Sequence, residues 1–247
     1  MQTRRAFTLT ELIVVIPAVA LMILLVLSCG RKHHGGGGIM KNSTLTRSLV
    51  QAMMTHASSN KDILPGRGKN GEVPASQIEY SDLGGHSVEG RYAILLENAL
   101  IDSPVMLSPG DNRNTPWTAP NMVTAENYSY ALLELETSAP RQQTWDGGNV
   151  SSTNPLVCDR LTSTITPNGR NRHTYKSYWS ATNQAWLGSV GYGDAHAEYE
   201  DDPFVADTRF SDLTCAEDDL FHDDTHGDCA NGNNALMVQR GKSGVTP

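Results

Sequence analysis

The chain has 247 residues, a net charge of −8 and 38% hydrophobic residues. Beyond an apolar run at its start, the remaining length suits one elaborated domain rather than several. That remaining part carries no basic patch of the kind that neutralises phosphate groups, so the acidic balance argues against nucleic acid as a partner.

The apolar run covers residues 12–27 without a single charged side chain. Folded as a helix, residues 7–29 would be about 34 Å long, which is enough to cross a hydrocarbon core of roughly 30 Å. Glu11 lies inside the start of this segment. An isolated carboxylate at that depth costs on the order of a few kcal/mol, so Glu11 is expected to be functional and to need a positively charged partner.

A basic leader, a small residue and the pattern Phe-Thr-Leu-x-Glu-Leu precede the apolar run, in the sequence Arg4-Arg5-Ala6-Phe7-Thr8-Leu9-Thr10-Glu11-Leu12. This stretch resembles the prepilin signal of type IV pilins and of type II secretion pseudopilins. In that family a membrane peptidase cuts just before the Phe and methylates the new amine. The resemblance implies cleavage between Ala6 and Phe7, and it makes Glu11 the acid that meets the N-terminal amine of a neighbouring subunit. Ala6 departs from the family, which usually has glycine there.

The same resemblance implies a fold, partners and a location. The fold is α+β and pilin-like, with a long N-terminal hydrophobic helix packed on an antiparallel β-sheet. The partners are prepilin peptidase and other copies of the chain, which form a helical filament. The precursor resides in the inner membrane, and the mature subunit resides in a periplasmic or extracellular filament.

Two export signals offer alternative interpretations of the same residues. Residues 3–7 also resemble a twin-arginine signal, and Val26-Leu27-Ser28-Cys29 resembles a lipoprotein cleavage box with Cys29 as the lipidated residue. A plain signal anchor is the simplest alternative. The two export signals leave Glu11 unexplained, because an export segment has no use for a buried acid, whereas the pilin interpretation requires one.

Composition divides the chain into four parts. They are a leader at residues 1–6, a transmembrane and assembly helix at 7–34, a glycine joint at 35–38 and an outer domain at 39–247. Pro17 is expected to kink the helix, because proline removes a backbone donor and clashes with the preceding turn. Four consecutive glycines favour a flexible or extended joint that interrupts the helix.

Helical spacing predicts two amphipathic helices in the outer domain. The first carries Leu45, Leu49, Met53 and His56 on one face, with an N-cap among residues 42–44. The second has its apolar positions at residues 92, 95, 96 and 99 and ends at the Asp-Ser-Pro sequence of residues 102–104. We expect each helix to pack one apolar stripe onto a sheet.

Later in the chain the apolar pattern favours strands. They are predicted at residues 105–107, 128–135, 156–158 and 175–179, and in a hairpin over residues 189–199 that turns at 193–195.

Three segments of the outer domain carry a finer resemblance. They read Ser-Pro-Gly-Asp at residues 108–111, Asn-Tyr-Ser-Tyr-Ala at 127–131 and Gly-Tyr-Gly-Asp-Ala-His-Ala-Glu at 191–198. In this order they resemble elements of a large pilin-like family abundant in planctomycetes and their relatives. Ser108 replaces a cysteine of that family, and Ala195 replaces a glycine.

The main candidates for disulfide formation and metal binding lie in the segment from Cys215 to Cys229. A disulfide between them would remove roughly 3 kcal/mol of unfolded-chain entropy, and pilins often staple their C-terminal region in this way. Such a pair, together with a membrane segment, indicates an oxidising compartment outside the cytoplasm. Cys158 is then left without a partner close in sequence.

Three interpretations of the loop between these cysteines stay open. Asp223, Asp224 and Asp228 supply oxygen ligands of the kind that calcium binds. His222 and His226 have the i, i+4 spacing of a helical zinc pair, although Asp223 stands where a metalloprotease has its catalytic glutamate. The simplest interpretation is a solvated acidic loop.

The sequence presents no recognisable nucleophile and base arrangement, no phosphate loop and no dinucleotide fingerprint. The predicted function is therefore structural and not enzymatic: a subunit of a type IV pilus-like or type II secretion pseudopilus filament. The alternative is a membrane-anchored or lipoprotein binding domain that does not polymerise.

Overall fold

The computed structural model describes residues 36–146, 150–163, 175–180, 185–224 and 227–245. The chain divides into two compact units, Met1–Gly36 and Gly37–Pro247, so the boundary falls inside the predicted glycine joint. The predicted membrane segment, residues 7–34, lies outside the described ranges. Within those ranges, no helix combines the length and the apolar character needed to cross a membrane.

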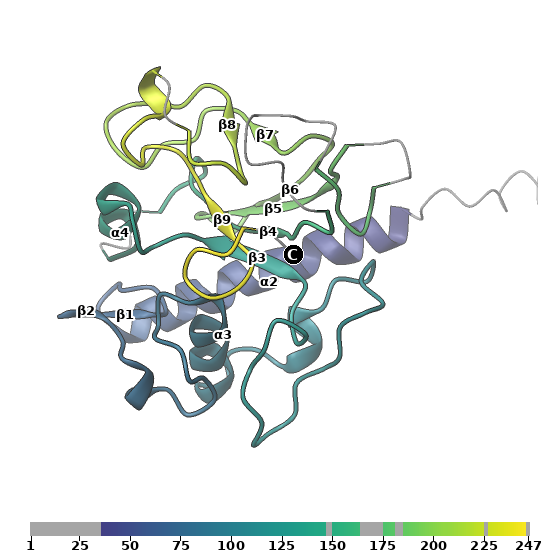
Figure 1. The fold of residues 1–247 in the computed structure, drawn as a ribbon, viewed down its shortest axis with the longest axis vertical. Helices are drawn as coiled ribbons and strands as arrows, with labels where there is room; N and C mark the ends of the chain where they lie inside the picture. Colours follow the sequence, from purple (N-terminus) through teal and green to yellow (C-terminus); the bar gives the residue numbers. More distant parts are fainter. Residues whose placement is uncertain (1–35, 147–149, 164–174, 181–184, 225–226, 246–247) are drawn as a thin grey trace, which may run out of the picture. The chain divides into compact units, whose positions relative to one another are not determined.

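The second unit has an α+β fold built on one five-stranded sheet (Figure 1). Its strands lie in the order β6-β5-β4-β3-β9, and all neighbours are antiparallel. The strand bounds are β3 Tyr130–Leu133, β4 Pro155–Asp159, β5 Gly188–Tyr192, β6 Ala197–Glu200 and β9 Met237–Val238. These findings confirm the predicted α+β class with an antiparallel sheet.

Smaller elements surround this sheet. Two small sheets have two antiparallel strands each. One pairs β1 Arg67–Gly68 with β2 Gly71–Glu72, and the other pairs β7 Phe204–Val205 with β8 Asp218–Asp219. The α-helices are α2 Gly36–Ser59, α3 Val88–Glu97 and α4 Ala139–Asp146. Short 3₁₀ helices lie at Ala75–Gln77, Ser103–Met106 and Gly227–Cys229.

Helix α2 crosses the main sheet and buries one stripe against it (Figure 1). Of the four predicted positions, Leu49, Met53 and His56 are buried and Leu45 is partly buried against the core, which confirms the amphipathic pattern. Gly191 of β5 permits the close approach, because a Cβ atom there would lie 2.8 Å from Cγ2 of Thr46 and 2.9 Å from Cγ2 of Val50. A glycine in the strand thus lets the helix contact the sheet backbone.

The start of α2 differs from the prediction. The helix begins at Gly36, so Gly36–Gly38 are helical and do not form the extended joint that the glycine composition suggested. Extending an existing helix adds one hydrogen bond for each residue fixed, which offsets the poor propensity of glycine. Asn42, predicted as a possible N-cap, therefore lies inside the helix, where its side chain is free to bond to the sheet.

Asn42 joins α2 to three strands through a buried polar cluster. Its amide nitrogen donates to Oδ2 of Asp159 and to Oγ of Ser189, at 2.9 Å in the second case. Its amide oxygen accepts from Ser108 and Tyr130, each at 2.8 Å. Burial raises the pKa of Asp159 to about 7, against the hydrogen bonds from Ser189 and Asn42 that favour its charged form.

Two predicted strands are wrong. Residues 103–106 form a 3₁₀ helix, because Pro104 fixes a helical φ in its first turn and offers no amide hydrogen to a sheet. Residues 175–177 have no regular secondary structure and residues 178–179 form a turn, in which the Ser177 hydroxyl accepts from the Trp179 amide at 3.2 Å. The second predicted helix exists as α3, but it begins at Val88 behind the N-cap Ser87 and ends at Glu97.

The other strand predictions are confirmed with small shifts of their ends. Strand β3 lies within the predicted range 128–135, and strand β4 extends beyond the predicted range 156–158 by one residue at each end. Strands β5 and β6 form the predicted hairpin. At its turn Ala195 has φ 65°, the left-handed region that favours glycine. A glycine at this position would fit the same turn without strain.

Candidate functional site

The N-terminal site residues lie outside the described ranges. Ala6 and Phe7, the predicted cleavage residues, and Glu11, the predicted assembly acid, all belong to residues 1–35. Cys29, on which the lipoprotein alternative depends, lies there too. These assignments stay predictions.

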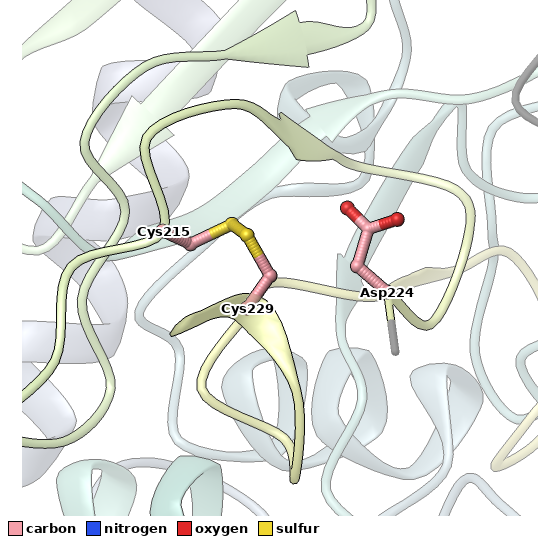
Figure 2. A group of neighbouring side chains, drawn as sticks. All are labelled: Cys215, Asp224 and Cys229. Atoms are coloured by element: carbon pink, nitrogen blue, oxygen red, sulfur yellow. A yellow bond between two sulfur atoms is a disulfide. The ribbon is translucent and has the colours of Figure 1, made fainter. Parts of the chain in front are cut away.

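The predicted disulfide is confirmed. Cys215 and Cys229, 14 residues apart, are bonded with their Cα atoms 4.6 Å apart (Figure 2). The bond ties the segment before β8 to the 3₁₀ helix at Gly227–Cys229, and both cysteines are buried. Cys158 is a buried free thiol in β4, and burial raises its pKa well above the ordinary value.

The loop between these cysteines is only partly solvated, because Asp218, Asp219 and Asp224 are buried while its other acidic residues are exposed. Oδ2 of Asp218 accepts from the Ala235 amide at 2.6 Å, and Oδ2 of Asp219 accepts from the Tyr175 hydroxyl at 2.9 Å. Burial raises the pKa of Asp218 to about 7 and that of Asp219 to about 6, and the negative charge of Asp224 acts in the same direction. The protein thus holds buried acids here that ionise less readily than free aspartate.

The three aspartates of the predicted calcium site have different environments. Oδ1 of Asp223 accepts from Nη2 of Arg141 at 2.7 Å, and Oδ2 of Asp224 accepts from the Asp219 amide at 3.0 Å. Asp228 is exposed. Among the residues that the structure places, these three are not one of the groups whose ligand atoms lie within 4.8 Å of one another. Calcium binding stays a prediction that this arrangement does not strengthen.

One such group does include Asp224, whose carboxylate lies beside Cys215 and Cys229 (Figure 2). Both sulfurs are consumed in the disulfide, so neither is the thiolate that a zinc site requires. His226 of the proposed histidine pair lies outside the described ranges, and Nδ1 of His222 lies 3.6 Å from Oδ1 of Asp224. The zinc interpretation therefore gains no second ligand here.

Arg141 of helix α4 connects this helix to the residues around the disulfide loop. Its buried guanidinium donates from Nη1 to Glu134 at 2.6 Å, from Nη2 to Asp223 at 2.7 Å and from Nε to the Asn234 carbonyl at 2.8 Å. Helix α4 is thereby fixed to the residues after β3 and to the disulfide loop. Sequence reasoning missed this residue, because two of its partners, Asp223 in the disulfide loop and Asn234 after it, lie 82 and 93 positions away.

A second cluster surrounds His86. Its Nδ1 lies 3.0 Å from Oε2 of Glu136, and its Nε2 lies 2.9 Å from Nη1 of Arg67. Arginine only donates, so Nε2 accepts and Nδ1 carries the proton of a neutral ring. Burial lowers the pKa of His86, and the charge of Arg67 adds to this, while Glu136 opposes it.

The His86 cluster already holds a cation. Ligand atoms of Glu72, His86 and Glu136 lie close enough for a metal ion, but Nζ of Lys242 lies 2.6 Å from Glu72 and 3.6 Å from Glu136. Burial alone would raise the pKa of Glu72, yet hydrogen bonds from Lys242 and from the His86 amide lower it. The cluster is an ion-pair network that joins β2 to the C-terminal segment.

Comparisons of the chain with protein-family models, with curated proteins and with solved structures found no match. The interpretation of the fold and of these clusters therefore depends on their own geometry. The two clusters bring together residues from distant parts of the chain, and the charges in them are largely paired. Their observed contacts hold loops and helices in place.

Proposed function

We propose that this chain is a structural subunit of a type IV pilus-like or type II secretion pseudopilus filament. The precursor is held in the inner membrane, is cut by prepilin peptidase between Ala6 and Phe7, and assembles through its N-terminal helix. The mature subunit then resides in a periplasmic or extracellular filament. Its role is that of a building block, and the proposal assigns it no catalysis.

One observation carries the proposal: the prepilin-like signal is followed in the chain by a helix that packs along an antiparallel sheet. Helix α2 buries Leu49, Val50 and Met53 against the sheet and fixes Asn42 to β4 and β5. This is the order and type of elements that a pilin-like subunit needs. The disulfide at Cys215–Cys229 agrees with the C-terminal staple that the resemblance implies.

The alternative keeps the outer domain but removes polymerisation. Val26-Leu27-Ser28-Cys29 has the form of a lipoprotein box, and a lipid on Cys29 would leave a membrane-anchored binding domain. The two proposals differ in which residue begins the mature protein.

Mass spectrometry of the mature N-terminus, with negative-stain microscopy of surface material, tests the proposal. We expect a chain that begins at Phe7, N-methylated, in filaments that contain this protein. A lipid-modified Cys29 as first residue would contradict the proposal and support the lipoprotein alternative. An intact Met1 would indicate a plain anchor and would equally contradict it.

A further inference from the structure

A hollow of about 380 Å³ lies at the end of the main sheet, and three arginines line it. Arg160 directly follows β4, Arg240 follows β9 after one residue, and Arg113 comes from the loop after the second 3₁₀ helix. Strands β4 and β9 are both antiparallel to β3, so their carboxyl-terminal ends meet beside the start of β3. The topology thus gathers positive charge, and we call this hollow the arginine pocket.

Arg160 is fixed in place by neutral groups. Its Nε donates to the Tyr178 hydroxyl at 2.8 Å, Nη1 to the Ala125 carbonyl at 2.7 Å and Nη2 to Oδ1 of Asn114 at 3.0 Å. A guanidinium has five N–H donors, so two remain for a ligand. In the described part of the chain, no carboxylate forms an ion pair with Arg160. Its charge is therefore oriented but not neutralised.

The other two arginines are exposed and lack ion-pair partners among the residues of known placement. The guanidinium carbon of Arg113 lies 4.8 Å from the ring centroid of Tyr178, which directs this side chain over a fixed aromatic surface. Arg240 is also exposed and lines the same pocket. One acid, Glu126, also lines the pocket, so the lining keeps a positive balance in a chain of net charge −8.

Gln239 adds an acceptor to these donors. The residue is 2% exposed and lines the pocket, and its Nε2 donates to the Val245 carbonyl. Its Oε1 is buried and has no hydrogen-bond partner among the residues that the structure describes. An unsatisfied buried acceptor costs free energy. Because Oε1 is closed to solvent, a ligand hydroxyl donates to it only after the Gln239 side chain turns toward the hollow, and that bond then satisfies the acceptor.

We propose that the arginine pocket binds a small hydroxylated organic anion of monosaccharide size, such as a uronic acid. The carboxylate pairs with the guanidinium groups, whose planar fork matches its two oxygens, and a hydroxyl donates to Oε1 of Gln239. The volume is in the range of small-molecule sites. A zwitterion fits less well, because a neutral ligand leaves the positive balance of the three arginines and Glu126 uncompensated.

This proposal concerns a ligand of the outer domain and does not depend on filament assembly. Calorimetric titration of the full-length chain in a non-ionic detergent tests it with four probes: glucuronate, glucose, acetate and alanine. We expect glucuronate to bind with a Kd below about 1 mM at low salt and more weakly as salt is added. Glucose lacks the charge and acetate lacks the hydroxyl, so each should bind at least about tenfold more weakly.

Variants of the two exposed arginines locate the site. Arg113→Gln and Arg240→Gln should each raise the Kd for glucuronate by about tenfold, since each removes a charged hydrogen-bond donor. Arg47→Gln, on the exposed face of α2, is the matched control and should leave the Kd unchanged. No glucuronate binding at low salt, equal binding of acetate or alanine, or an unchanged Kd in both pocket variants would each overturn the proposal.

Discussion

Asp159 sets the pH response of the contact between helix α2 and the sheet. Its carboxyl is fully buried, and it accepts from the Ser189 amide at 2.7 Å and from the side chain of Asn42. Burial raises its pKa from 3.8 to about 7 in the folded protein. Between those values the folded state binds the proton more tightly than the unfolded state, so the contribution of Asp159 to stability falls as pH rises.

The variant Asp159→Asn isolates this effect. An asparagine oxygen accepts the same two hydrogen bonds but does not ionise, so the free energy of unfolding of the variant minus that of wild type should increase from about pH 4 to about pH 7 and then level off. Urea unfolding at a series of pH values measures it. Asp82→Asn, an exposed aspartate, is the matched control. A difference that is flat over this range would show that Asp159 is ionised in the folded protein throughout.

At the scale of elements, the sequence predicted what depends on local periodicity. The stripe of α2, the strands β3 and β4 and the hairpin of β5 and β6 all follow from apolar spacing over several residues. The 3₁₀ helix at Ser103–Met106 was missed, because a short apolar run does not distinguish a turn of helix from a strand. Strand β9 has two residues and gains its place only by pairing with β3.

The candidate sites were harder to predict from the sequence, because most of them also depend on contacts between residues far apart in the chain. The disulfide was predictable from two cysteines 14 residues apart. The arginine pocket was not, since Arg113, Arg160 and Arg240 are separated by whole strands and meet only because β4 and β9 end together. The net charge did not indicate the pocket either, because the chain as a whole is acidic although the lining of this pocket is positive.

The disulfide stabilises the loop that Arg141 also contacts through Asp223. Closing a loop of 14 residues should contribute about 3 kcal/mol, chiefly by restricting the unfolded chain. We therefore expect the double variant Cys215→Ala with Cys229→Ala to lose about 2–3 kcal/mol in urea unfolding. Reducing agent should lower the stability of wild type by a similar amount and leave the variant unchanged. A linked peptide joining Cys215 to Cys158 under non-reducing digestion would contradict this pairing.

Calcium has its own test in the same loop. A ligand that binds only the folded state raises stability by mass action, so melting temperatures in calcium and in chelator measure whether such a site exists. A site built from Asp223, Asp224 and Asp228 predicts a higher melting temperature in calcium. Because Asp223 already pairs with Arg141, calcium binding would also have to loosen the contact to α4. Equal melting temperatures in calcium and in chelator would show that this loop does not form a calcium site.

At the scale of the whole molecule, the two compact units have separate tasks in the proposed filament. The unit Gly37–Pro247 contains the sheet, the disulfide and the arginine pocket. Assembly is assigned to the other unit, which holds Glu11 and the apolar run. A change at Glu11 should therefore separate assembly from folding of the outer domain.

No Lys, Arg or His occurs between Leu12 and Cys29 to neutralise Glu11 from within its own apolar segment. The cation that the prepilin resemblance implies is the amine of a processed Phe7 on a neighbouring subunit. Such a pair offsets the desolvation of both charges and sets the register between subunits, even where it adds little net stability. The pairing thus belongs to assembly and makes no demand on the outer domain.

We expect Glu11→Ala to remain in the membrane, with the melting temperature of the outer domain unchanged, and to abolish or strongly reduce filaments. Glu11→Gln should behave in the same way, because it keeps the size and polarity of the side chain but loses the charge that the amine requires. Glu79→Ala, an exposed glutamate of the outer domain, is the matched control and should assemble normally. Filament yield by negative-stain microscopy and melting by circular dichroism measure the two effects. Normal filaments from Glu11→Ala, under conditions where wild type assembles, would remove the main physical argument for a pilin-like subunit.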